Sequence, residues 1–140
     1  MKSCVVDASV VLEAMFRDPL ADCAKQVLTG GYTMLAPDLI YAEVAHVIKK
    51  RYVCGDIDEV NAQFFLEETR RSPWTITSCG DLAELALQLA IATNRSAYDC
   101  MYLALACVKQ TVMITADKRL VNALANTPWA KHIAWLGDVS

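Results

Sequence analysis

The chain has 140 residues, a net charge of −3 at neutral pH, 55% hydrophobic residues and a mean hydropathy of +0.28. This length fits a single domain, residues 1–140, that buries about two thirds of its unfolded surface. No apolar run approaches the ~18 residues of a membrane span. The acidic balance excludes a general attraction to nucleic acid, so phosphate binding would need local basic patches or bound cations.

The high apolar content predicts burial in a partner interface. Met1-Lys2-Ser3 is followed at once by a strand pattern, without the apolar region of a signal peptide, so we expect a cytoplasmic protein. The six cysteines are scattered and form no C-x-x-C pair. A zinc site or a disulfide framework is therefore not expected.

The chain opens with a strand that ends in an acid. Cys4-Val5-Val6 has no polar face, which is typical of a central strand covered on both sides, and Asp7 follows it. The pattern returns late in the chain, where Val112 to Thr115 leads through Ala116 to Asp117. Because ligands of open α/β sheets bind outside the carboxyl ends of the strands, both aspartates are predicted at that edge.

Between and after these strands, helical and strand patterns alternate. Asp56 with Glu59 resembles a capping box, Asp81 is a predicted helix cap, and Ser96 opens the most apolar helix. Helices are predicted for 9–15, 19–29, fifteen residues from Pro37-Asp38, 56–71, 81–93, 97–110 and 118–125, and further strands for 33–36, 74–77 and 133–136. The alternation predicts right-handed crossovers and a parallel sheet within a three-layer α/β sandwich.

Two further acids lie in apolar surroundings. Asp99 is the only charge in residues 97–108, and it is either a capping partner of Ser96 or a site residue. Glu43 has Leu39 and Val47 at i−4 and i+4, and it is either a boundary residue turned to solvent or a metal ligand. For Asp7 and Asp117 the alternative is N-capping of the helices that follow.

The coarse fold directs all four acids toward one edge of the sheet. Two carboxylates ~5 Å apart at an effective dielectric of ~20 repel by ~3 kcal/mol, so four cannot all stay ionised unaided. A hard divalent cation resolves the conflict, and oxygen-only ligands favour Mg²⁺ or Mn²⁺. Such a site suits phosphodiester hydrolysis. Ser9 and Thr115 either orient the acids or metal-bound water, or cap strand ends.

With these acids in place, the chain resembles a PIN domain, and specifically the small VapC-type toxins of toxin-antitoxin pairs. The matching segments are Val5-Val6-Asp7-Ala8-Ser9, residues 37–44, residues 96–106 and residues 114–120, in the family's order and spacing. The resemblance implies a parallel sheet of strand order 3-2-1-4-5 and a Mg²⁺- or Mn²⁺-dependent endoribonuclease. It assigns metal ligation to Asp7, Glu43, Asp99 and Asp117, with Ser9 and Thr115 at the family's hydroxyl positions.

The resemblance also implies homodimerisation and inhibition by a cognate antitoxin that packs across the active-site groove. Lys49-Lys50-Arg51 and Arg70-Arg71 are interpreted as charges at helix ends, whereas Arg95, Lys118 and Arg119 are candidates for touching RNA phosphates. Tyr41, Tyr98 and Tyr102 are interpreted as core or interface residues. The alternative function is a catalytically silent PIN-like module that only binds partners.

Overall fold

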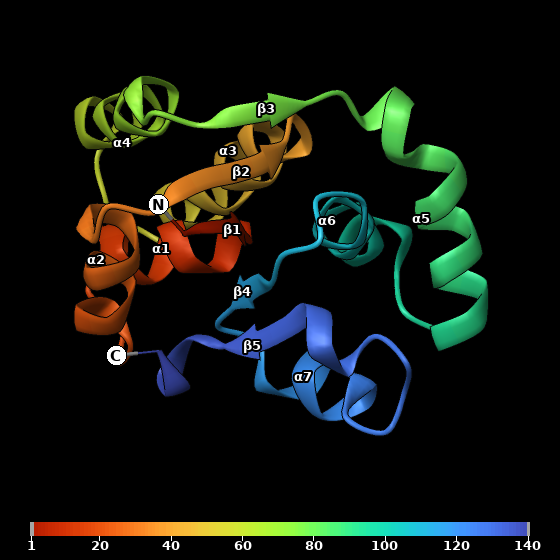
Figure 1. Cartoon of the computed structure of the whole chain (residues 1–140). Coiled ribbons are helices and arrows are strands. Elements are labelled where there is room, and N and C mark those ends of the chain that lie inside the picture. The colour runs from red at the N-terminus through yellow and green to blue at the C-terminus, as the bar shows by residue number, and fades with distance from the viewer. Residues whose placement is uncertain (1, 140) are drawn as a thin grey trace.

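The computed structural model describes residues 2–139 and contains one five-stranded sheet (Figure 1). Its strands are β1 (Ser3–Val6), β2 (Thr33–Pro37), β3 (Thr75–Thr77), β4 (Met113–Thr115) and β5 (Ile133–Trp135). All neighbouring strands are parallel, in the order β3-β2-β1-β4-β5. The predicted parallel sheet and its strand order are confirmed.

Within residues 2–139, seven α-helices join the strands. They are α1 (Ala8–Phe16), α2 (Ala21–Thr29), α3 (Leu39–Val53), α4 (Glu59–Arg71), α5 (Cys79–Thr93), α6 (Ala97–Val108) and α7 (Lys118–Leu124), with short 3₁₀ turns η1 (Ala130–His132) and η2 (Leu136–Asp138) around β5. α1 to α4 gather on one side of the sheet, and α5 to α7 gather on the other (Figure 1). The predicted three-layer α/β/α sandwich is confirmed, and the right-handed rule for parallel crossovers explains the division.

The centre of the core is α6, which packs against β1, β2 and β4. Every residue from Tyr102 to Ala106 is buried, as is Cys100. The apolar sequence of this helix, with Asp99 in its first turn, predicted that placement. Since α6 crosses three strands, its N-terminal turn is fixed relative to their ends.

Two predicted helix caps are wrong by a few residues. α4 is capped by Asp58, whose carboxylate accepts the N–H of Asn61 at 2.7 Å, rather than by Asp56. α5 is capped by Ser78, so Asp81 lies inside the first turn. In both places another polar residue close by had the extended backbone that an N-cap requires. The cap at Ser96 is confirmed by its 3.0 Å bond from the Asp99 N–H.

Within residues 2–139, no helix is long and apolar enough to cross a membrane. All six cysteines are free thiols, and Cys4 and Cys100 are buried.

Candidate active site

Asp7 lies at the carboxyl end of β1 and is only 8% exposed. Its Oδ2 accepts two hydrogen bonds, from the hydroxyl of Ser9 at 2.6 Å and from that of Thr115 at 2.8 Å. Asp7 occupies the N-cap position of α1, but its carboxylate makes no capping bond. The capping alternative is therefore not realised, and the carboxylate is held by one hydroxyl from the first turn of α1 and one from the end of β4.

The same two hydroxyls also accept bonds from the segment after β4. The Ala116 N–H donates to Ser9 Oγ at 3.0 Å, and the Asp117 N–H donates to Thr115 Oγ1 at 3.1 Å. Each hydroxyl therefore links Asp7 to the backbone that carries Asp117. Both predicted support residues lie where they can fix the relative placement of two acids, because β1 and β4 are direct neighbours.

Glu43 projects from the second turn of α3 and is partly buried. Its Oε1 accepts a 2.6 Å bond from the hydroxyl of Tyr102, a side chain with no exposed surface. The carboxylate is thus held by a partner on α6 instead of extending freely into solvent. The sequence interpretation treated Tyr102 only as core or interface. A usable signal was present, because this hydroxyl lies one helical turn after Asp99 on a helix with no other charge.

Asp99 and Asp117 each belong to the start of a helix. Asp99 is at the third position of α6, where its N–H donates a hydrogen bond to the Ser96 hydroxyl at 3.0 Å. Asp117 caps α7 by accepting the Leu120 N–H at 3.2 Å, so the capping alternative is realised for this residue. A capping carboxylate keeps further lone pairs, so capping does not by itself exclude a second role.

The electrostatics indicate that the four acids are neighbours. Burial raises the pKa of Asp7, the charge of Asp99 raises it further, and the Ser9 and Thr115 bonds oppose the shift. Burial also raises the pKa of Glu43, with smaller contributions from Asp7 and Asp99. The pKa of Asp99 is raised first by burial and then by Asp117. Each acid therefore interacts with at least one other, although they come from four separate segments.

The structure does not gather the acids into a closed ligand set. Among residues 2–139, no group of three or more His, Cys, Asp or Glu side chains is assembled closely enough to hold a metal ion. The four carboxylates repel one another, and at least three are bonded to hydroxyl or amide donors. The donor set nevertheless fits a hard cation, because its ligands are all carboxylate oxygens. Burial, with a smaller contribution from neighbouring carboxylates, raises the pKa values of Asp7, Glu43 and Asp99.

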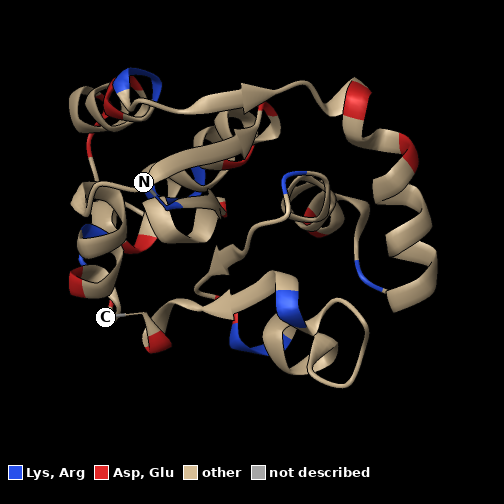
Figure 2. Cartoon of the chain, in the orientation of Figure 1, with Lys and Arg blue, Asp and Glu red and all other residues tan. Residues whose placement is uncertain are grey.

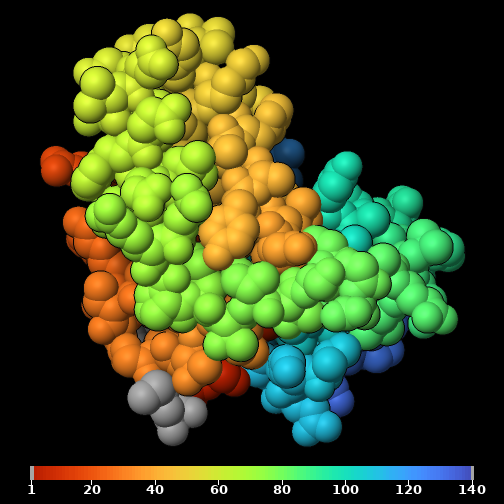
Figure 3. Space-filling view, turned by 90° about the horizontal axis from the view of Figure 1, so that it is seen from above, coloured from red at the N-terminus to blue at the C-terminus, as the bar shows by residue number. Residues whose placement is uncertain are grey.

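A hollow of about 390 Å³ opens beside Glu43, between α3 and the start of α6. It is lined by Leu39, Ala42, Glu43, His46, Val47 and Tyr98. The space-filling view shows the body indented between α3 and the teal start of α6 (Figure 3). Glu43 forms part of the wall, and Tyr98 is 64% exposed directly before Asp99. Glu43 can therefore be approached from this side.

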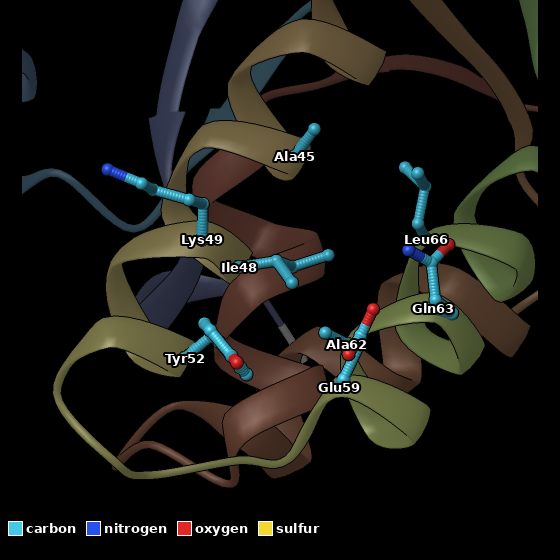
Figure 4. A pocket seen from close by; sticks show the side chains of 8 residues that line it. All are labelled: Ala45, Ile48, Lys49, Tyr52, Glu59, Ala62, Gln63 and Leu66. Atoms are coloured by element: carbon cyan, nitrogen blue, oxygen red, sulfur yellow. The ribbon is translucent and has the colours of Figure 1, made fainter.

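A second hollow, of about 350 Å³, lies between α3 and α4 (Figure 4). Side chains from both helices point into it, including Ile48 and Tyr52 of α3 and Leu66 of α4. None of the four acids lines this hollow, so it has no part in the candidate active site.

The predicted placement of basic residues at the ends of α3 and α4 is confirmed. Arg51 pairs with Asp18 at 3.3 Å and lies over the ring of Phe16, and Arg70 and Arg71 pair with Glu67. These charges are engaged at the ends of α3 and α4. Arg95 interacts with Asp99, whose pKa it lowers. Lys118 and Arg119 are exposed at the start of α7.

A parallel sheet in this order, with acids following its central strands, defines a PIN-like fold. The model of the PIN domain family matches residues 4–125. The chain therefore belongs to the PIN-domain family.

Among PIN-domain proteins, the chain is similar to Ribonuclease VapC1 of Mycobacterium tuberculosis strain H37Rv. The two are 30% identical over 127 residues, which cover 88% of this chain and 92% of that protein. The predicted resemblance to VapC-type proteins is confirmed at the level of family.

Solved structures agree on the fold. PAE2754 from Pyrobaculum aerophilum superposes with a TM-score of 0.72 at 19% identity. The matched region covers 97% of this chain and 85% of the PAE2754 chain. A toxin-antitoxin complex from Klebsiella pneumoniae gives a TM-score of 0.66 at 19% identity, over 94% and 96% of the two chains.

Proposed function

We propose that this chain, acting as one nuclease domain over residues 1–140, is a divalent-metal-dependent endoribonuclease and the toxin of a toxin-antitoxin system. The observation that carries the proposal is that Asp7, Glu43, Asp99 and Asp117 come from separate segments to the carboxyl edge of the sheet, where burial and neighbouring carboxylates raise the pKa values of Asp7, Glu43 and Asp99. The similarity to a VapC ribonuclease supports RNA as the substrate.

The four carboxylates would hold Mg²⁺ or Mn²⁺, directly or through water. When bound, such an ion polarises a phosphoryl oxygen and lowers the pKa of a coordinated water. The chain's own residues hold the ligands in place: Ser9 and Thr115 donate to Asp7, and Tyr102 donates to Glu43. These donors stabilise the ionised carboxylates that a metal needs, and they limit the directions in which the carboxylates can turn.

Cleavage of total cellular RNA by the purified protein tests the proposal. We expect discrete products with Mn²⁺ and none with excess EDTA, because phosphodiester hydrolysis at an oxygen-ligand site needs the cation. The Asp99→Asn variant, assayed with Mn²⁺, controls for contaminating nucleases. Products that persist in EDTA or with Asp99→Asn would contradict the assignment.

The alternative is a catalytically silent module that only binds partners. Calorimetric titration with Mn²⁺ separates the two functions when no RNA is cleaved. Mn²⁺ binding that is lost when Asp7 is replaced would support the nuclease proposal. The absence of binding at millimolar Mn²⁺ would support the silent module.

A cognate antitoxin protein and a second copy of this chain are the proposed partners. The supporting observation is the set of large apolar side chains that stay exposed: Tyr52, Val53, Val60, Phe64, Ile76, Leu87, Ile91, Tyr98 and Val108. Several lie on α3, α4 and α5, outside the acid cluster. Sedimentation of the chain alone at micromolar concentration tests the homodimer, and a monomer there would contradict it.

The Tyr102→Phe variant tests the role of the buried hydroxyl. Phenylalanine keeps the ring that packs in the core but removes the donor to Glu43. We expect Mn²⁺ affinity, measured by calorimetry, to fall about tenfold, as for other partners of metal ligands. Tyr41→Phe is the matched control, because the Tyr41 hydroxyl makes no hydrogen bond within residues 2–139. Equal Mn²⁺ affinity of the two variants would show that the Tyr102 hydroxyl serves packing only.

A further inference from the structure

The start of α7 carries a lysine held on an aromatic ring. Lys118 follows Asp117 directly, and its Nζ lies 3.9 Å from the centroid of the Trp135 ring. Trp135 ends β5, where it is in register with Thr115 of β4, and the Thr115 hydroxyl donates to Asp7. In Figure 2 the blue start of α7 lies beside β5. The lysine and the tryptophan therefore belong to the same edge of the sheet as the candidate active site.

The Trp135 ring is fixed by packing rather than by hydrogen bonding. Its Nε1 is buried and has no acceptor among the described residues. A side chain at Gly137 would meet the ring, since an added Cβ would lie 2.4 Å from two ring carbons. An unpaired buried N–H costs about 1–3 kcal/mol, so hydrogen bonding does not explain this orientation. The orientation does present a ring face to the lysine, and the face of tryptophan binds cations best.

The charge of Lys118 is not neutralised. Lys118 is exposed and forms no ion pair within residues 2–139, unlike Arg51, Arg70 and Arg71. A cation over a ring keeps its full charge and can bind an anion at the same time. Its position also lacks a local structural reason, because a positive charge in the first turn opposes the partial charge of a helix N-terminus.

We infer that Lys118 contacts a backbone phosphate of the RNA strand beside the acid cluster, and that Trp135 is its positioning residue. The inference rests on the proposed function, which brings a polyanion to four carboxylates. The RNA phosphates and the carboxylates repel one another, and the unpaired ammonium group of Lys118, beside Asp117, offsets this repulsion. Trp135 limits the positions of a flexible side chain, so less conformational entropy is lost when the phosphate binds.

Binding of RNA without cleavage tests this inference. All variants are made in the Asp99→Asn background, and a short fluorescein-labelled single-stranded RNA of mixed sequence is followed by anisotropy with Mn²⁺ over a range of salt concentrations. We expect Lys118→Gln to weaken binding about three- to tenfold at low salt and to reduce the salt slope by ~0.7, the value for one phosphate on a single strand. Lys118→Arg should retain most of the affinity, because the charge remains.

Tryptophan variants test the positioning role. Trp135→Leu should weaken binding, and Trp135→Phe, which keeps a ring face, should restore most of it. The double variant Lys118→Gln/Trp135→Leu should bind no worse than Lys118→Gln, because Trp135 acts through the lysine. Thermal unfolding reports any loss of fold. Lys109→Gln is the matched control: Lys109 is also exposed, but it precedes β4 and so lies toward the opposite edge of the sheet.

The outcomes separate the inference from the proposed function. Equal affinity and salt slope for Lys118→Gln and Lys109→Gln would overturn the inference, as would additive losses in the double variant or no RNA binding by any protein. A Lys118→Gln variant that retains Asp99 could also be tested for RNA cleavage. Cleavage with an unchanged KM would overturn the inference about Lys118 and would still support the nuclease function. RNA binding that depends on Lys118, in a chain that never cleaves, would support the contact and contradict the nuclease.

Discussion

Replacing Asp7 with asparagine is expected to reduce Mn²⁺-dependent RNA cleavage by at least about a thousandfold, the scale on which hydrolases lose activity without a catalytic group. Asp7 receives both hydroxyl bonds at the centre of the acid cluster. Asparagine keeps the shape and can accept those bonds, but it lacks the negative charge that binds a cation. The initial rate of cleavage of an RNA identified from total cellular RNA is the measurement.

The same substitution is expected to leave the fold intact. Burial and Asp99 raise the pKa of Asp7, so the ionised carboxylate opposes folding in the absence of metal. The midpoint of thermal unfolding in EDTA should therefore stay the same or rise. Asp81→Asn is the matched control, because Asp81 is an exposed acid in the first turn of α5. Equal cleavage by both variants would exclude Asp7 from the site.

The second large effect concerns stability with and without the cation. At neutral pH and about 100 times its Kd, Mn²⁺ should stabilise the chain by about 2.7 kcal/mol. For a domain of this size that corresponds to a rise in Tm of about 10 °C. The expected cause is that the cation removes repulsion among carboxylates whose pKa values are raised. Scanning calorimetry with Mn²⁺ and with EDTA measures the difference.

The pH dependence of the metal-free chain has a definite sign. Asp7, Glu43 and Asp99 have raised pKa values in the folded state, whereas the unfolded values are about 3.9–4.3. At a pH between the unfolded pKa and the raised folded pKa of such a group, the folded state binds more protons than the unfolded state. The free energy of unfolding therefore falls as pH rises through this range. In EDTA, stability should therefore increase as pH is lowered from neutral toward about 5.

With Mn²⁺ this trend should reverse, because protons compete with the metal for the carboxylates. Both the Mn²⁺ effect and the gain on acidification should shrink in Asp7→Asn. A Tm that does not respond to Mn²⁺ at neutral pH would contradict the metal site. An unchanged response in Asp7→Asn would place the ion elsewhere.

Features that depend only on residues close together along the chain could be predicted from the sequence. The apolar run before Asp7 predicted the central strand, and the composition of α6 predicted its burial. The order of helices and strands followed from local periodicity, which is encoded within each segment. The choice of the four candidate acids followed from their positions in the predicted elements and from the resemblance of the motifs to PIN domains. Even the local rules failed by a few residues at the caps of α4 and α5, where two polar residues compete for one position.

Contacts between distant segments required the tertiary structure. The Glu43–Tyr102 bond joins residues 59 apart, and the Thr115–Asp7 bond joins residues 108 apart. The fold alone decided that Asp117 caps its helix while Asp7 does not, and that Lys118 lies on Trp135. The physical reason is that a strand or helix is fixed by its own residues, whereas the partner of a side chain is fixed by how strands register and helices pack. The sequence thus determined the fold class, the four candidate acids and the hydroxyls of Ser9 and Thr115, and the tertiary structure decided that Tyr102 donates to Glu43 and that Lys118 lies over Trp135.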